Sequence, residues 1–201
     1  MKWKATENTL VREDIVDLLK DFDNQVVQKL GLPKSKYSAY IVGGAAIILR
    51  GLNEKKTADI DLIEVSSVLT NFLRDYGDGT INDRADTCIS DFSCDFYDRA
   101  LRLNIGTKAI NFYVISLEDV IISKLATPRT KDRIDIRRED VIKKVNWDLL
   151  DVLVKEHAKF ALNKMRGSIL LAQYKEYLKD VEEIKNNWTK DRSNKEFYDE
   201  H

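Results

Sequence analysis

Two aspartates spaced one residue apart offer the clearest chemistry in this sequence. They are Asp59 and Asp61, within the apolar run TADIDLIEV. Successive side chains of a strand point to opposite faces, so these carboxylates share a face, roughly 7 Å apart at Cα, while Ile60 and Leu62 point into the core. Burying carboxylates is unfavourable without a partner, and Mg²⁺ commonly binds one or two carboxylates together with substrate phosphates. We therefore predict that Asp59 and Asp61 bind Mg²⁺, or Mn²⁺ in its place.

A pair of glycines precedes the aspartates and suits a different ligand. Gly43 and Gly44 close the apolar run SAYIV and open GAAIILRGL, which reads as a short helix. Backbone N–H groups at such a strand-to-helix junction are accessible because no side chain covers them, which favours a phosphate. Either feature alone is explained by a tight turn or a solvated strand end. The order strand, helix, acidic strand favours nucleotide chemistry.

The elements expected to position these residues alternate between strands and helices. Apolar spacing predicts a helix that ends near Gly31 and Pro33, strands before Gly43 and across the two aspartates, and a helix with a serine start and a glycine stop. A hairpin is expected over RALRLNIGTKAINFYVI. Helices are then expected to begin at Ser116, with Asp119 in the capping-box position, at Thr130 and at Trp147. The last helical stretch is expected to be interrupted at Gly167 and Ser168. Residues 77–100 fit no clear pattern.

This order predicts an α+β fold with α/β-like features: a small mixed sheet flanked by helices, followed by a helical C-terminal subdomain. The expected domains are residues 1–145 and residues 146–201, the second packed on the first.

Composition limits the classes of protein. The chain has 201 residues, 43% of them hydrophobic, 33% charged, and a net charge of -1, so any nucleic-acid binding requires a local patch. Cys88 and Cys94 read as reduced thiols, since the start of the chain has no secretory pattern. No run is apolar enough to cross a membrane, so we expect a soluble protein of the cytoplasm.

The motifs together resemble the nucleotidyltransferase-fold superfamily. The first motif is Val42-Gly43-Gly44 followed, after a slightly long spacer, by Asp59-Ile60-Asp61-Leu62. The stretch VISLEDVIISKLATPRTKDRIDI is similar to a bacterial branch of small uncharacterised nucleotidyltransferase-like proteins related to abortive-infection toxins of the AbiEii type. The resemblance covers roughly residues 39–136.

The resemblance implies roles for particular residues. Gly43 and Gly44 would hold the phosphates of an NTP, and Asp59 and Asp61 would bind the metal. Lys124 would neutralise the triphosphate, with Lys131 and Asp132 near the site. The implied reaction transfers a nucleotidyl group to a hydroxyl of RNA, tRNA, protein or a small molecule, and a cognate antitoxin is the implied protein partner.

One departure leaves the reaction open. Active members add a third carboxylate from a neighbouring strand, but AINFYVI offers Asn111, and Asp83, Asp91 and Asp95 lie in the unassigned segment. A catalytically degenerate binding or regulatory module is therefore the alternative, since a fold does not determine a function.

The segment from residue 124 to residue 144 is basic. It is either a patch for a nucleic-acid acceptor or a solvated helix face, and its eight cations are Lys124, Arg129, Lys131, Arg133, Arg137, Arg138, Lys143 and Lys144.

Overall fold

The computed structural model describes residues 9–52, 56–83, 95–161 and 164–199, with side chains described as far as residue 186 in the last helix. The chain divides into two compact units, Met1–Val120 and Ile121–His201, and each is described by itself. The domain boundary expected after residue 145 stays a prediction.

The first unit is built on one mixed sheet of five strands in the order β3-β2-β1-β5-β4. β1 is antiparallel to β2 and parallel to β5, β2 is parallel to β3, and β4 is antiparallel to β5. The α+β fold with a small mixed sheet flanked by helices is thus confirmed. The strands are β1 (Tyr37–Val42), β2 (Ile60–Ile63), β3 (Ile81–Asn82), β4 (Leu101–Arg102) and β5 (Ile110–Val114).

Within the described ranges of this unit, four helices accompany the sheet, and three of them follow the sequence pattern closely. α1 and α2 occupy the segments predicted to be helical, and α3 begins after the N-cap Ser66, whose Oγ accepts a hydrogen bond from the Leu69 N–H at 3.4 Å, and ends before Gly77. The helices of this unit are α1 (Arg12–Leu30), α2 (Gly43–Leu49), α3 (Ser67–Tyr76) and α4 (Phe96–Arg99).

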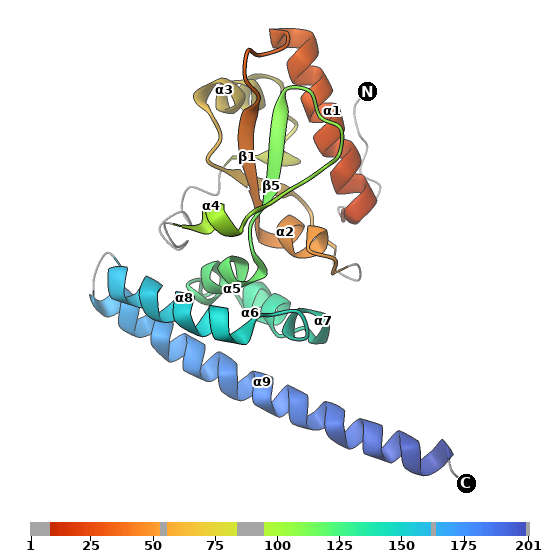
Figure 1. The fold of residues 1–201 in the computed structure, drawn as a ribbon, viewed down its shortest axis with the longest axis vertical. Coiled ribbons are helices and arrows are strands. Elements are labelled where there is room, and N and C mark those ends of the chain that lie inside the picture. Colours follow the sequence, from red (N-terminus) through yellow and green to blue (C-terminus); the bar gives the residue numbers. More distant parts are fainter. Residues whose placement is uncertain (1–8, 53–55, 84–94, 162–163, 200–201) are drawn as a thin grey trace. The chain divides into compact units, whose positions relative to one another are not determined.

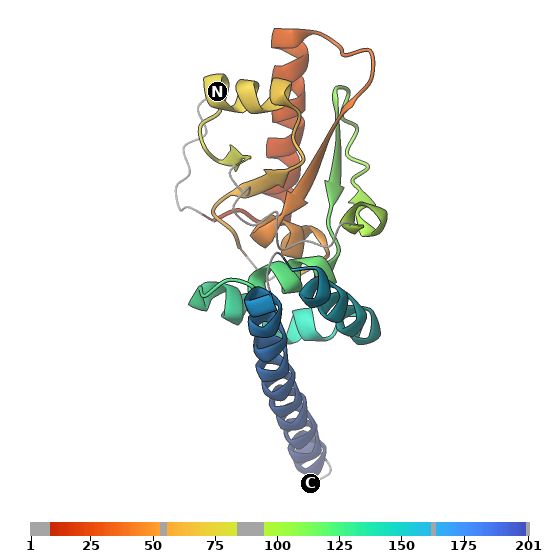
Figure 2. The ribbon, with the colours of Figure 1, turned by 90° about the vertical axis from the view of Figure 1, so that its left-hand side faces the viewer.

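The two faces of the sheet differ in what covers them. Phe112 of β5 is fully buried and lies 6.4 Å, between ring centroids, from Phe22 of α1. Tyr40 of β1 points to the opposite face, where its ring contacts Phe96 of α4 at 5.5 Å. Figures 1 and 2 show α1 and α4 on opposite sides of β5. The core therefore lies on the α1 face.

A buried carboxylate ties α1 to the start of β5. Asp23, 1% exposed, accepts hydrogen bonds from the backbone N–H groups of Lys108, Ala109 and Ile110 at 2.6, 2.8 and 2.7 Å. Three donors satisfy a carboxylate that would otherwise be costly to bury. This contact positions the predicted hairpin, which is confirmed by the pairing of β4 with β5.

The segment that resisted assignment from sequence contains β3 and α4. Arg99, at the end of α4, donates to both carboxylate oxygens of the fully buried Asp119 at 3.0 and 2.8 Å and pairs with Asp95 at 2.9 Å. Ser116 Oγ accepts from the Asp119 N–H at 3.0 Å, which confirms the expected N-cap. Cys88, Cys94 and Asp91 lie outside the described residues.

The second unit is helical, as predicted for the end of the chain. α5 carries the chain from the first unit into it, and the helix expected from Thr130 is divided in two, because Arg138 is extended and pairs with Asp140 at 3.0 Å. α8 and α9 pack side by side (Figure 1). The helices are α5 (Leu117–Leu125), α6 (Thr130–Ile136), α7 (Glu139–Ile142), α8 (Trp147–Phe160) and α9 (Lys164–Asp199).

The expected break at Gly167 and Ser168 is wrong, because both residues lie inside α9. A Cβ on Gly167 would lie 2.2 Å from the carbonyl oxygen of Ala158 on α8. The glycine therefore permits a close approach of two helices instead of ending one.

Candidate functional site

The two aspartates lie at β2, as predicted. Asp61 is within the strand and Asp59 immediately precedes it, and both are half-buried. The intervening Ile60 and the following Leu62 are fully buried. The alternation of a strand therefore places both carboxylates on the face away from the core.

The glycine pair lies next to these carboxylates. Val42, the last residue of β1, pairs with Asp61 of β2, and Gly43 follows at the start of α2. Gly43 has a φ of 63°, and a Cβ at this position would lie only 3.1 Å from Asp61 Oδ2. Both the positive φ and the close carboxylate favour glycine. Sequence spacing alone did not show that this glycine and this aspartate touch.

A cavity of about 690 Å³ opens beside the carboxylates. Its wall combines carboxylate and amide oxygens, the guanidinium of Arg74 and apolar side chains. This mixture is expected of a site that binds a polar ligand with a planar group. Gly77 and Gly79 leave its rim without side chains. The lining residues are Asp59, Asp61, Thr70, Leu73, Arg74, Gly77, Gly79, Ile81, Asn82 and Asp83.

β3 supplies the neighbouring oxygen ligands. Asn82 pairs with Asp61 across the parallel strands, so an amide and a carboxylate share this face of the sheet. Asp83 follows and lines the same cavity. Asp95, another candidate for a third carboxylate, is instead paired with Arg99, and Asn111 accepts a hydrogen bond from Arg102 Nη2 at 2.8 Å.

The donor set is compatible with a hard divalent cation. Two carboxylates and an amide oxygen are ligands that Mg²⁺ prefers, and it completes its shell with water and substrate phosphates. Among the residues that the structure describes, no three His, Cys, Asp or Glu side chains gather as a metal cluster.

The other predicted site residues lie in the second unit. Lys124, 7% exposed, donates to Asp132 Oδ1 and, at 2.8 Å, to Asp135 Oδ2. Thr127 Oγ1 donates to Asp132 Oδ2 at 2.8 Å. Burial alone would raise the pKa of Asp132, but the Lys124 ammonium and the Thr127 hydroxyl outweigh it, and the pKa lies below its ordinary value.

The resemblance placed Lys124 and Asp132 near one site but did not predict that they pair with each other, and it did not include Asp135. The two aspartates are three residues apart on α6, a spacing that places them on one helix face, and this was the available signal. Lys131, in the first turn of α6, is exposed. The roles of Lys124, Lys131 and Asp132 toward the nucleotide stay predictions.

The basic segment 124–144 is extensively paired within its own unit. Arg129 pairs with Asp132, and Lys143 with Glu139. Arg137 reaches Asp180 of α9, with 2.7 Å between Nε and Oδ2. None of the ion pairs found among the described residues involves Lys131 or Arg133.

The family follows from a match that spans most of the chain. Residues 17–182 match the family described as "Nucleotidyltransferase of unknown function (DUF6036)". The chain belongs to this family. The assignment to the nucleotidyltransferases is thereby confirmed, and it covers both the glycine–aspartate motif and the Lys124 segment.

Two further comparisons add little to this assignment. Among solved structures, the chain is similar to an antigenic nucleotidyltransferase-like protein from Paracoccidioides brasiliensis, with 16% identity, a TM-score of 0.40, and coverage of 82% of this chain and 95% of that one. No curated protein matches the chain. Within the described ranges of this DUF6036 nucleotidyltransferase, no helix is long and apolar enough to cross a membrane.

Proposed function

We propose that the chain transfers a nucleotidyl group from an NTP to a hydroxyl acceptor, with Mg²⁺ or Mn²⁺ bound by Asp59 and Asp61. The observation that carries this proposal is that Asp59 and Asp61 line one cavity, while the backbone at Gly43 lies so close to Asp61 that an added Cβ would be 3.1 Å from its Oδ2. Backbone N–H groups at Gly43 and Gly44 would bind phosphate oxygens where no side chain intervenes.

The residues of the chain act mainly by positioning. In the reaction, the acceptor oxygen bonds to the α-phosphorus, the bond to the pyrophosphate oxygen breaks, and the hydroxyl proton passes to a carboxylate. Asp83 is the described carboxylate of the cavity that remains for this proton once Asp59 and Asp61 bind the cation. The cation, when bound, would neutralise negative charge on the phosphates while the acceptor oxygen replaces the pyrophosphate oxygen at the α-phosphorus.

Lys124 has a proposed role in the same reaction. Its ammonium would approach the triphosphate as a compact cation, with Asp132 fixing its position and Lys131 adding a second cation. The acceptor is proposed to be nucleic acid, with the basic segment 124–144 as a contact. A toxin function with a cognate antitoxin rests on the resemblance to the abortive-infection branch.

A degenerate binding module is the second candidate. It is favoured by Asn82, which occupies the position beside Asp61 on β3 where an acid would complete a metal cluster. An amide there can bind a cation but cannot accept the hydroxyl proton. In this case the chain would bind a nucleotide without turning it over.

The proposal is tested by calorimetric titration of each common NTP, with and without Mg²⁺. Asp59→Ala/Asp61→Ala should abolish the metal-dependent binding that wild type shows. The matched control is Asp17→Ala/Asp21→Ala, which removes the same charge from exposed positions of α1 and should bind normally. An assay of label transfer from NTP to RNA, and then to small acceptors, distinguishes an active nucleotidyltransferase from a degenerate binding module. Failure of every NTP to bind with either metal contradicts the proposal.

A further inference from the structure

The sheet face opposite α1 carries a row of side chains from four neighbouring strands. Tyr40 of β1 pairs with Ile63 of β2 on one side and with Tyr113 of β5 on the other, and Tyr113 pairs with Arg102 of β4. Residues paired across strands share a face. The row spans about 14 Å, which corresponds to three interstrand spacings.

Aromatic rings form the centre of this row. Tyr40 and Tyr113 stack with 4.9 Å between ring centroids and an interplanar angle of 17°. Tyr97 of α4 meets the edge of Tyr40 at 5.1 Å and 83°. Tyr97 is 41% exposed, and both stacked rings are half-buried. A ring surface that remains open on a sheet can stack with a nucleobase.

Glu64 holds the edge of the aromatic group. It is the only non-glycine residue with positive φ, 52°, among the described residues, a conformation that is unfavourable for its side chain. Burial together with the Glu64 carboxylate raises the pKa of Tyr97 to about 12. Tyr97 is therefore a neutral, oriented ring near neutral pH.

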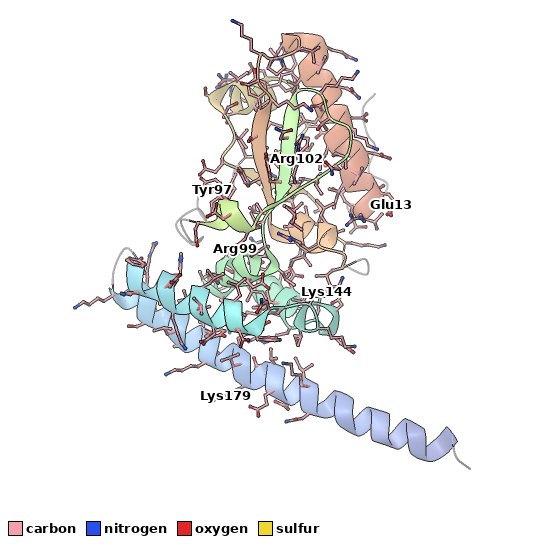
Figure 3. The ribbon with its side chains drawn as sticks, viewed as in Figure 1. Glu13, Tyr97, Arg99, Arg102, Lys144 and Lys179 are labelled. Carbon is pink, nitrogen blue, oxygen red and sulfur yellow. The ribbon has the colours of Figure 1, made fainter. Side chains whose placement is uncertain are left out.

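A cation ends the row on its far side. Arg102 is exposed and donates to Asn111 Oδ1 at 2.8 Å, which orients its guanidinium on the tyrosine face. Figure 3 shows Tyr97 on α4 and Arg102 on β4. Arginine suits phosphate oxygens.

The opposite end of the row adjoins the candidate metal site. Asp61 pairs with Val42, two residues from Tyr40 on the same face of β1. Asp61 and Tyr40 are thus diagonal neighbours, whose separation is about 7–8 Å. Carboxylates, aromatic rings and a guanidinium therefore follow one another across a single face.

We propose that Tyr40, Tyr113 and Arg102 of this row, together with Tyr97 of α4, bind the end of a single-stranded nucleic-acid acceptor, with a base on the tyrosines and a phosphate on Arg102. The inference rests on the proposed function and names its acceptor. A polymer fits better than the donor NTP, because the donor phosphates belong beside Asp59 and Asp61, whereas Arg102 lies beyond the tyrosines. A single strand is required because a duplex hides the base faces.

The test is fluorescence anisotropy of a short, end-labelled single-stranded RNA, with single-stranded DNA and duplex of the same sequence, on the full chain without NTP. Tyr113→Leu should weaken binding about tenfold through lost stacking, whereas Tyr113→Phe should retain it. Arg102→Gln should weaken binding and lower the salt slope by about one. Lys20→Gln, on α1 and so on the other side of the sheet, is the control that should not change binding. Thermal unfolding verifies that each variant is folded. If Tyr113→Leu does not fold, Arg102→Gln, at an exposed position, still tests the inference.

The outcomes separate this inference from the proposed function. The inference is overturned if Tyr113→Leu and Arg102→Gln both bind the single strand as tightly as wild type does. It is also overturned if only Lys131→Gln/Arg133→Gln loses binding, because that result would assign the acceptor to the basic segment. Duplex that binds as tightly as single strand also overturns it. If no strand binds although an NTP binds with Mg²⁺, the row fails, whereas the proposed nucleotide and metal site at Asp59 and Asp61 stands. Strand binding that depends on Tyr113, without any NTP binding, supports the row alone.

Discussion

Replacing Gly43 by alanine separates two properties of the same residue, its backbone conformation and its contact with Asp61. Gly43 has a φ of 63°, and an added Cβ would lie 3.1 Å from Asp61 Oδ2. The left-handed conformation disfavours alanine by about 1–2 kcal/mol, which lowers the melting temperature by about 2–8 °C for a chain of this size. The methyl group also forces the carboxylate to move by a few tenths of an ångström.

Gly106 provides the matched control. Its φ is 78°, and an added Cβ would meet no atom within 4 Å. Gly106→Ala therefore has the same backbone penalty without a steric contact. Both variants should lose similar stability in thermal unfolding, whereas only Gly43→Ala should lose affinity for Mg²⁺ and NTP, by about tenfold or 1.4 kcal/mol, in calorimetric titration.

Two results would refute this reasoning. If Gly43→Ala binds nucleotide as wild type does, the space beside Asp61 is not part of the nucleotide site. If Gly106→Ala loses the same affinity, the effect comes from general destabilisation and the contact explains nothing.

Three further predictions concern the second unit. Lys124→Met removes the buried ammonium that Asp132 and Asp135 share and should lower the free energy of unfolding in urea by about 3–5 kcal/mol, whereas Lys131→Met, at an exposed site, should change it by less than about 0.5 kcal/mol. Because the pKa of Asp132 is lowered in the folded state, its contribution is present above the unfolded pKa of about 3.9 and is lost as pH falls. The stability difference between wild type and Asp132→Asn should therefore narrow below about pH 4, and a constant difference would contradict this assignment. Gly167→Ala should cost about 1–3 kcal/mol in urea unfolding, because its Cβ would lie 2.2 Å from the Ala158 oxygen, and equal stability of Gly167→Ala and Ser168→Ala would exclude that close approach.

The elements that sequence predicted well are those with strong local signals. α1 carries apolar residues at helical spacing, and α3 has both Ser66 as its N-cap and Gly77 at its end. The buried Ile60 and Leu62 follow from alternation alone. These features depend on a few consecutive residues, so a single sequence contains the information.

The features that sequence missed depend on pairing between distant segments. β3 has two residues and lies among turn formers, so its parallel register with β2 could not be predicted, and with it the position of Asn82 beside Asp61. In the sequence, Tyr40 and Tyr113 are ordinary strand residues. They become neighbours only because β1 and β5 pair in parallel. The break between α6 and α7 depends on Arg138 and Asp140, whose charges gave no helix-stop signal.

Two residues with positive φ lie next to β2. Gly43 and Glu64 belong to two different segments, and the conformation is readily adopted by the glycine but unfavourable for the glutamate. Gly43 leaves space beside Asp61, and the Glu64 carboxylate interacts with Tyr97. Glu64→Gly, which relieves the strain but removes the carboxylate, should therefore preserve stability while weakening single-strand binding in the anisotropy assay. Unchanged binding would mean that the conformation of Glu64 serves the fold alone.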